Sequence, residues 1–114
     1  MTQGYLEANL LTAAIDDETT SPWVDVRGRT HLVFYLSGLG TTSSGVITLE
    51  EGFPTMENVW PATPVSITTV NASGVSGGVQ LATHATVAAY GFVRARVSTA
   101  IGGGGSVTAR LIAV

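Results

Sequence analysis

Apolar and polar residues alternate along most of this chain, and clusters of turn-forming residues separate the alternating segments. The clearest alternation lies in residues 91–114, which read GFVRARVSTA, then IGGGG, then SVTARLIAV. A period of two puts successive side chains on opposite faces, which is typical of strands with one buried side. Because the glycines at 102–105 adopt positive φ freely, this segment predicts an antiparallel hairpin. One face of the hairpin would cover a core, and the other would carry Arg94, Arg96 and Arg110.

Shorter runs rich in β-branched and aromatic residues predict further strands. They lie at residues 23–26, 30–37, 46–51, 65–71 and 79–83. The run THLVFYLS at 30–37 is the strongest, and its mainly apolar residues predict a central strand covered on both faces. Residues 72–78, ASGVSGG, read as a loop.

Together these elements predict an all-β fold, a single antiparallel β-sandwich that is jelly-roll-like, with seven or eight short strands. At 114 residues the chain has the size of one domain. Residues 21–114 are expected to form the sandwich. Residues 1–20 are expected to form an N-terminal arm or a first strand, with a short helix as a further alternative.

Charge is scarce, at 11% of the residues against about 25% in an average protein. Lysine is absent and all five basic residues are arginine, the cation that is enriched at protein interfaces. This favours a surface covered by neighbours in an assembly, although a small surface of Ser, Thr and Gly is the alternative. All eight acids lie in the first half, whereas Arg94, Arg96 and Arg110 lie in the last quarter. The two groups can pair across a subunit boundary or within one chain.

The same composition excludes several classes of partner. A net charge of −3 argues against nucleic-acid binding, which needs a basic footprint. No run of about 18 apolar residues is present, so no membrane span is expected. The first residues lack the basic and apolar stretches of a secretory signal.

Patterns that could carry chemistry are few, and each has a simpler explanation. The stretch GVSGG at 74–78 fits the G-x-S-x-G nucleophile pattern, but no helix follows it, so a plain loop is expected. Cysteine is absent, and His31 and His84 alone are too few ligands for a zinc site. We expect His31 in the core or at its boundary and His84 in a turn. The acids at 16–18 and 50–51 lack the spacing of a calcium loop and read as solvated loops. No catalytic residue, cofactor or metal site is predicted, and the protein is not expected to be an enzyme.

Five aromatic residues carry the remaining binding potential: Tyr5, Trp23, Tyr35, Trp60 and Tyr90. The tryptophans are expected to fill the core of the sandwich or close its ends, because each buries a large area. A platform on which sugar rings stack and an anchor at an interface are the alternatives.

Two parts of the chain resemble small β-sandwich structural proteins of the virions of tailed bacteriophages. The first part contains VDVRG at 24–28, THLVFYLSG at 30–38 and GVITLEEGFPTMENVW at 45–60, and the second is the closing stretch at 91–114. In that family the middle piece commonly runs V-T-L-E-G-S-x-D-G-x-N-W. This chain has ITLEEG and ENVW, with FPTM in place of the Asp-Gly turn. The resemblance implies a virion component, such as a capsid decoration (cement) protein, and it brings no catalytic residues.

The resulting hypothesis is a non-enzymatic capsid decoration protein that binds and stabilises a phage head shell. Its expected partners are the major capsid protein and copies of itself, in a homotrimer, on the capsid surface after synthesis in the host cytoplasm. The proposed interface residues are Tyr5, Leu6, Arg94, Arg96 and Arg110. A carbohydrate-binding module on a virion or cell surface, and a tail or head-to-tail connector component, are the alternatives.

Overall fold

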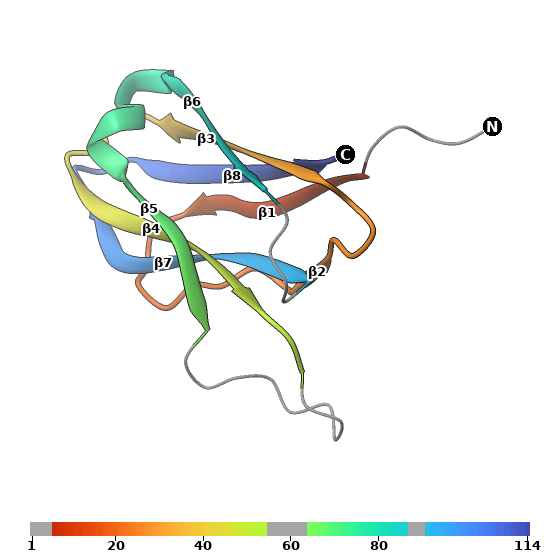
Figure 1. Cartoon of the computed structure of the whole chain (residues 1–114). Helices are drawn as coiled ribbons and strands as arrows, with labels where there is room; N and C mark the ends of the chain where they lie inside the picture. Colours follow the sequence, from red (N-terminus) through yellow and green to blue (C-terminus); the bar gives the residue numbers. More distant parts are fainter. Residues whose placement is uncertain (1–5, 55–63, 87–90) are drawn as a thin grey trace.

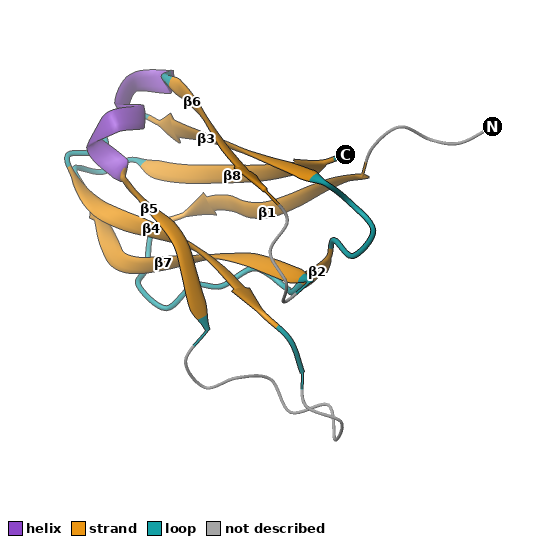
Figure 2. Cartoon of the chain, viewed as in Figure 1, coloured by secondary structure: helices purple, strands orange, loops and turns teal. Residues whose placement is uncertain are grey.

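The computed structural model describes residues 6–54, 64–86 and 91–114, which form two packed antiparallel sheets (Figures 1 and 2). Sheet A has the strand order β1-β8-β3-β6 and sheet B the order β2-β7-β4-β5. The strands are β1 (Leu6–Ala14), β2 (Val24–Asp25), β3 (His31–Leu39), β4 (Ser44–Gly52), β5 (Val65–Asn71), β6 (Gln80–Thr86), β7 (Phe92–Gly102) and β8 (Ser106–Ala113).

The chain passes from one sheet to the other at most of its connections, which is the eight-stranded jelly-roll arrangement. Only β4 and β5, which pair with each other, follow one another within the same sheet of this described set. The predicted all-β class, antiparallel sandwich and jelly-roll topology are therefore confirmed. Leu6–Ala14 form β1, an edge strand of sheet A that pairs with β8.

The core lies between the inner faces of the sheets, and alternating residues supply it. From sheet A, the fully buried side chains come mainly from β3 and β8: Leu32, Phe34, Leu36, Val107, Ala109 and Leu111. From sheet B, they come from β4 and β7: Ile47, Leu49, Val93, Ala95 and Val97. The alternation predicted for residues 91–114 thus assigns the buried faces of β7 and β8 correctly.

The predicted hairpin in residues 91–114 is wrong, because β7 belongs to sheet B and β8 to sheet A. Alternation specifies which face of a strand is buried, but it carries no information about the neighbouring strand. Here β7 pairs with β2 and β4, and β8 pairs with β1 and β3. The glycine run carries the chain across the end of the sandwich. Arg94 and Arg96 therefore lie on a different sheet from Arg110.

Two further expectations need correction. The strand β3 is interior to sheet A, but it is not covered on both faces, because Tyr35 on the outer face is 41% exposed. Residues 72–78 are not a plain loop but a short 3₁₀ segment, η1 (Ala72–Gly78), which joins β5 to β6. Val75 and Ala72 of η1 are fully buried, so η1 closes one end of the core between the two sheets (Figure 2).

Candidate functional site

The outer face of sheet B carries a compact ion-pair network centred on Glu50. Its carboxylate is 3% exposed and accepts hydrogen bonds from Arg94 Nε to Oε1 and from Arg96 Nε to Oε2, both at 3.0 Å. Arg96 also contacts Glu18, with 3.2 Å between Arg96 Nη1 and Glu18 Oε1. The hydrogen bond with Glu50 raises the pKa of Arg96 above its ordinary value. The guanidinium of Arg94 lies over the ring of Trp23, 4.5 Å from the ring centroid. The two arginines thus hold carboxylates of their own chain.

The other ion pairs seen among residues 6–54, 64–86 and 91–114 are also within the chain. Arg110 on β8 pairs with Glu7 on β1, on the outer face of sheet A. Arg27 pairs with Asp25 at 2.7 Å, and this contact lowers the pKa of Asp25 to about 2. Of the two alternatives left open by the sequence, pairing within one folded chain is the one observed for these residues.

The five residues proposed as an interface do not share one surface. Tyr5 lies outside the described residues, and Leu6 is half-buried on edge strand β1, where it packs against the core. Arg94 and Arg96 lie on the outer face of sheet B, whereas Arg110 lies on the outer face of sheet A. Whether any of them contacts a partner stays a prediction.

The expectation of solvated acidic loops is wrong for Glu50 and Glu51, which are both buried in β4. Glu51 lies between Val65 of β5 and Val93 of β7 in the register, and burial raises its pKa. An acid with a raised pKa in the folded state costs no stability below its ordinary pKa, where both states are protonated. Above that pH the unfolded chain ionises more readily, and stability is lost as the pH rises.

Replacing Glu51 by glutamine is therefore expected to stabilise the protein at pH 7 by roughly 0.5–1 kcal/mol. The gain in stability should disappear below about pH 4, where the wild type and the variant both carry a neutral side chain at position 51. Urea unfolding of the wild type and the variant at pH 7 and pH 4 measures both effects. Equal stability of the wild type and the variant at pH 7 would mean that burial does not penalise the Glu51 carboxylate.

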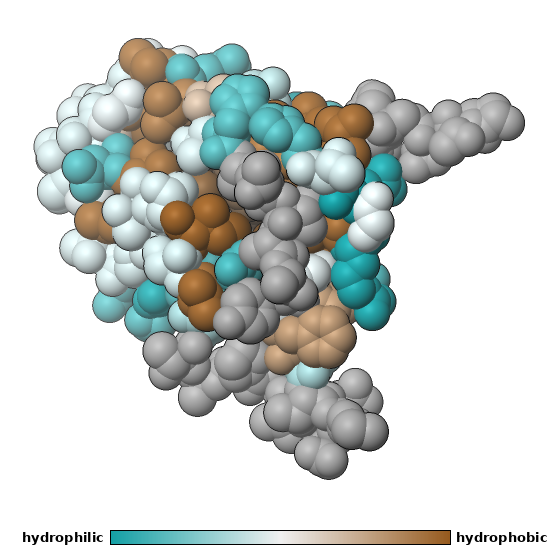
Figure 3. All heavy atoms as spheres, viewed as in Figure 1, coloured by the Kyte–Doolittle hydropathy of each residue, from teal (hydrophilic) through white to brown (hydrophobic). Residues whose placement is uncertain are grey.

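One end of the sandwich is built from loops without charged side chains. The β3–β4 loop (residues 40–43), η1 and the β7–β8 loop (residues 103–105) gather there, at the left of Figure 1. Two exposed apolar residues flank them, Leu39 at 69% and Val79 at 53% exposure. We call this set, residues 39–43, 72–79 and 102–105, the uncharged end; in Figure 3 it is mostly white and brown. Asp16 and Asp17 lie at its border, because the preceding Ile15 accepts a hydrogen bond from Ile101 N.

Hydrogen bonds tie the loops of the uncharged end to one another. Thr42 is fully buried, and its Oγ1 donates to the carbonyl of Ala72 at 2.6 Å. Thr42 N donates to Ser76 Oγ, and Gly77 N donates to the carbonyl of Gly40. Ser43 N donates to the carbonyl of Gly102, which connects the β7–β8 loop to the same set. The uncharged end is therefore a preformed surface.

Ser76, the serine of the G-x-S-x-G stretch, has a structural role at this end. Its hydroxyl accepts the hydrogen bond from Thr42 N and lies in a 3₁₀ segment between two strands. A nucleophilic serine of this pattern needs a strand-to-helix elbow. Ser76 therefore links η1 to the β3–β4 loop.

The only two histidines meet on the outer face of sheet A, with 3.0 Å between His31 Nε2 and His84 Nδ1. His84 lies in β6 and not in a turn, because β6 extends to Thr86 beside β3. Within residues 6–54, 64–86 and 91–114 no three His, Cys, Asp or Glu residues gather as metal ligands. In the same ranges no helix is long and apolar enough to cross a membrane.

Comparison with known proteins places this fold beside phage-derived proteins. The SPBc2 prophage-derived protein YomS superposes with a TM-score of 0.63 and 14% identity, over 99% of this chain and 96% of YomS. The PBSX exported protein XepA superposes with a TM-score of 0.64 and 11% identity, over 96% of this chain. The chain spans 37% of the length of XepA. At these identities the likeness concerns the fold. No family model and no curated protein matches the sequence.

The uncharged end is indicated in the sequence by long stretches without charged residues, which the overall composition does not reveal. Residues 30–49, 58–93 and 97–109 contain no Asp, Glu, Lys or Arg. Each stretch supplies one of the three loops, and the fold brings these loops together. Trp23, expected to fill the core or to close an end of the sandwich, is half-buried on the outer face of sheet B, where its ring contacts Arg94. Trp60 lies outside the described residues.

Proposed function

We propose that this protein is a non-enzymatic structural component of a phage particle, which decorates and stabilises the head shell by docking through its uncharged end. The observation that carries the proposal is the preformed, charge-free surface with Leu39 and Val79 at its margin. The fold that it has in common with prophage-derived YomS, and the resemblance of its sequence to phage β-sandwich proteins, support the same conclusion.

The physical chemistry of the uncharged end suits a permanent contact. Docking removes water from a surface, and a charged side chain that loses water without a partner is costly. Residues 39–43, 72–79 and 102–105 present only backbone, hydroxyl and apolar groups, so this cost is small. Because hydrogen bonds already fix the loops, little conformational entropy is lost on binding.

Decoration explains why a modest contact would be sufficient. A protein that bridges neighbouring shell subunits adds contact free energy that the shell must lose before it opens. Many copies at repeated sites make this contribution large even when each contact is weak. We propose the major capsid protein as the partner and a homotrimer as the assembled form, since closed rotational symmetry suits a three-fold position. The capsid surface is the proposed location.

Arginine has a smaller role in this proposal than in the sequence-based hypothesis. Arg94 and Arg96 already hold Glu50, and Arg110 holds Glu7, so each arginine would contact a partner only through its remaining N–H groups. Reversing the charge of Arg94 and Arg96 would break the network at Glu50 as well as any interface. A test of docking therefore needs variants outside the ion pairs.

The variant Leu39→Asp is expected to weaken binding to phage particles assembled without this chain by about 10-fold or more. Leu39 is 69% exposed, so the substitution adds a charge to the docking surface without opening the core. Val65→Asp is the matched control, because Val65 is also exposed, at 44%, but lies in β5 at the opposite end, beside Glu51. Cosedimentation of purified protein with the particles measures both affinities.

Equal binding by wild type and Leu39→Asp would contradict docking through the uncharged end. Loss of binding in both variants would indicate a general effect of added charge and would also count against this surface. Attachment to tails in place of heads, seen by electron microscopy of labelled protein, would favour the tail or head-to-tail connector alternative.

A further inference from the structure

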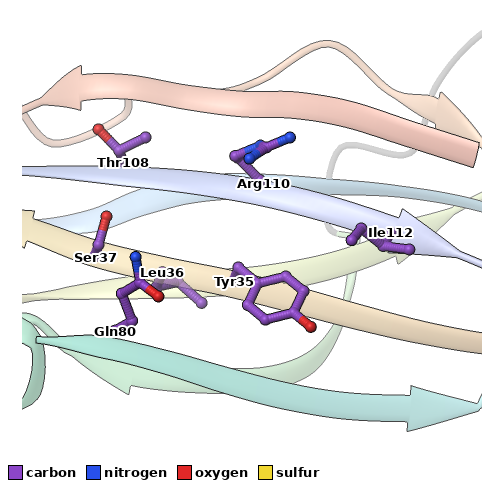
Figure 4. Close-up of a pocket in the computed structure, with 7 residues that line it drawn as sticks. All are labelled: Tyr35, Leu36, Ser37, Gln80, Thr108, Arg110 and Ile112. Carbon is purple, nitrogen blue, oxygen red and sulfur yellow. The ribbon is translucent and has the colours of Figure 1, made fainter.

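The outer face of sheet A contains a depression of about 280 Å³, on the opposite side of the sandwich from the Glu50 network. It is lined by Tyr35, Leu36, Ser37, Gln80, Thr108, Arg110 and Ile112. Figure 4 looks onto this face and shows the ring of Tyr35 lying flat along β3, with its face turned outward. The side chain of Arg110 on β8 lies beside the ring, and those of Ser37, Gln80 and Thr108, from strands β3, β6 and β8, lie together to one side of it.

Register explains how the strands build this depression. Ser37 pairs with Thr108 of β8 on one side and with Gln80 of β6 on the other, which makes one polar row across three strands. In the next row, Tyr35 pairs with Arg110 and with Ala82. Side chains directly opposite one another in a sheet are near neighbours. The small side chain of Ala82 leaves the ring of Tyr35 uncovered on that side, so a flat aromatic surface borders a polar row.

We propose that this depression binds one ring of a neutral carbohydrate. A pyranose ring has an apolar face of C–H groups, which stacks on an exposed aromatic ring, and a rim of hydroxyls that need donors and acceptors. Tyr35 supplies the stacking surface, and Ser37, Gln80 and Thr108 supply hydroxyl and amide groups. The volume is slightly below the range of about 300 to 1,000 Å³ that is usual for ligand pockets, which suits one sugar ring.

The charged groups at the depression favour a neutral ligand over an acidic one. Among the described residues that line the depression, Arg110 alone is charged, and it pairs with Glu7 of β1. The pair carries no net charge, so a phosphate or carboxylate would have to displace Glu7 to gain an ion pair. The other N–H groups of the guanidinium can still donate to sugar hydroxyls.

Tyr35 is one of the five aromatic residues that the sequence offers as a platform for sugars, and it suits this role better than Trp23. One face of Trp23 is already covered by the guanidinium of Arg94, whereas Tyr35 is 41% exposed. Tyr35 and its neighbours lie on paired interior strands, so their backbone positions are fixed before a ligand arrives.

Titration of the purified protein tests this site without phage particles, so its result is independent of the proposed docking to a shell. The probes are cellohexaose, maltohexaose, xylohexaose, mannohexaose and chitohexaose, with hexagalacturonate as the acidic comparison. Isothermal titration calorimetry and NMR chemical-shift changes measure their binding. At least one neutral hexaose is expected to bind. Tyr35→Ala should weaken that binding by about 10-fold, the value of one lost stacking contact.

Two further variants separate a sugar site from a general surface effect. Tyr35→Phe keeps the stacking face, so its affinity should stay within about 3-fold of wild type. Trp23→Ala, on the other sheet, should leave the affinity unchanged. Circular dichroism checks that each variant is folded. The proposal is overturned if no neutral hexaose binds, if Tyr35→Ala binds as well as wild type, or if hexagalacturonate binds more tightly than the neutral sugars.

Discussion

Replacing Glu50 by glutamine is expected to lower the free energy of unfolding by about 3 kcal/mol, the lower end of the range for breaking a buried ion pair. The carboxylate is 3% exposed and accepts hydrogen bonds from both Arg94 and Arg96. A neutral amide would leave two guanidinium groups side by side without the charge that lies between them. Both arginines keep some contact with water, which places the estimate at the lower end. Urea unfolding at pH 7 measures the change.

Glu7→Gln is the matched control for this prediction, since it breaks the pair with Arg110, in which both side chains are about half exposed. Solvent-exposed ion pairs contribute about 0–1 kcal/mol, so the control should change stability little. If the two variants lose the same amount of stability, the Glu50 network is no more than an ordinary surface ion pair. The neighbouring Glu51→Gln, with a predicted gain, gives a contrast of opposite sign within one strand.

Gly38→Ala is expected to destabilise the protein by about 3 kcal/mol, at the upper end of typical overpacking costs. A methyl group at position 38 of β3 would lie 2.3 Å from the carbonyl oxygen of Val75 and 2.9 Å from its carbonyl carbon. Both atoms belong to the backbone of η1, so a side-chain rotation cannot relieve the clash. The segment would have to move away from β3 and would disturb the hydrogen bonds of Thr42 to η1.

Gly74→Ala controls for the loss of a glycine in the same region. Apart from the adjacent backbone of η1 itself, no heavy atom of the described residues lies within 4 Å of a methyl group placed there. Such a replacement restricts the unfolded chain and commonly stabilises by about 0.4–1 kcal/mol. Thermal and urea unfolding of the two variants should therefore shift in opposite directions. Similar stabilities would show that η1 is not held tightly against β3, and the uncharged end would then not be preformed.

Local sequence patterns predicted the buried faces well, because alternation and burial are both local properties of a strand. Val93, Ala95 and Val97, and later Val107, Ala109 and Leu111, are buried as the pattern indicates. The predicted strand at 65–71 coincides with β5. Pairing partners are set by the whole fold, and for this reason the expected hairpin of β7 with β8 was wrong.

The candidate sites depend on pairing between distant strands, so the sequence could not indicate them. Glu50 meets Arg94 and Arg96 because β4 lies beside β7, and Tyr35 meets Arg110 because β3 lies beside β8. The polar row of Thr108, Ser37 and Gln80 likewise spans three strands that are far apart in the sequence. The uncharged end was partly visible as three long stretches without charge, but only the topology brings their loops together.

The most direct test of the proposed decoration role is the copy number of this chain in purified phage particles from its source, measured by quantitative mass spectrometry against the major shell protein. The proposal predicts a number comparable to that of the shell protein, or one copy for every three shell subunits. A number in the single digits or low tens would place the protein in the tail or neck. Complete absence from the particles would contradict a structural role in the virion.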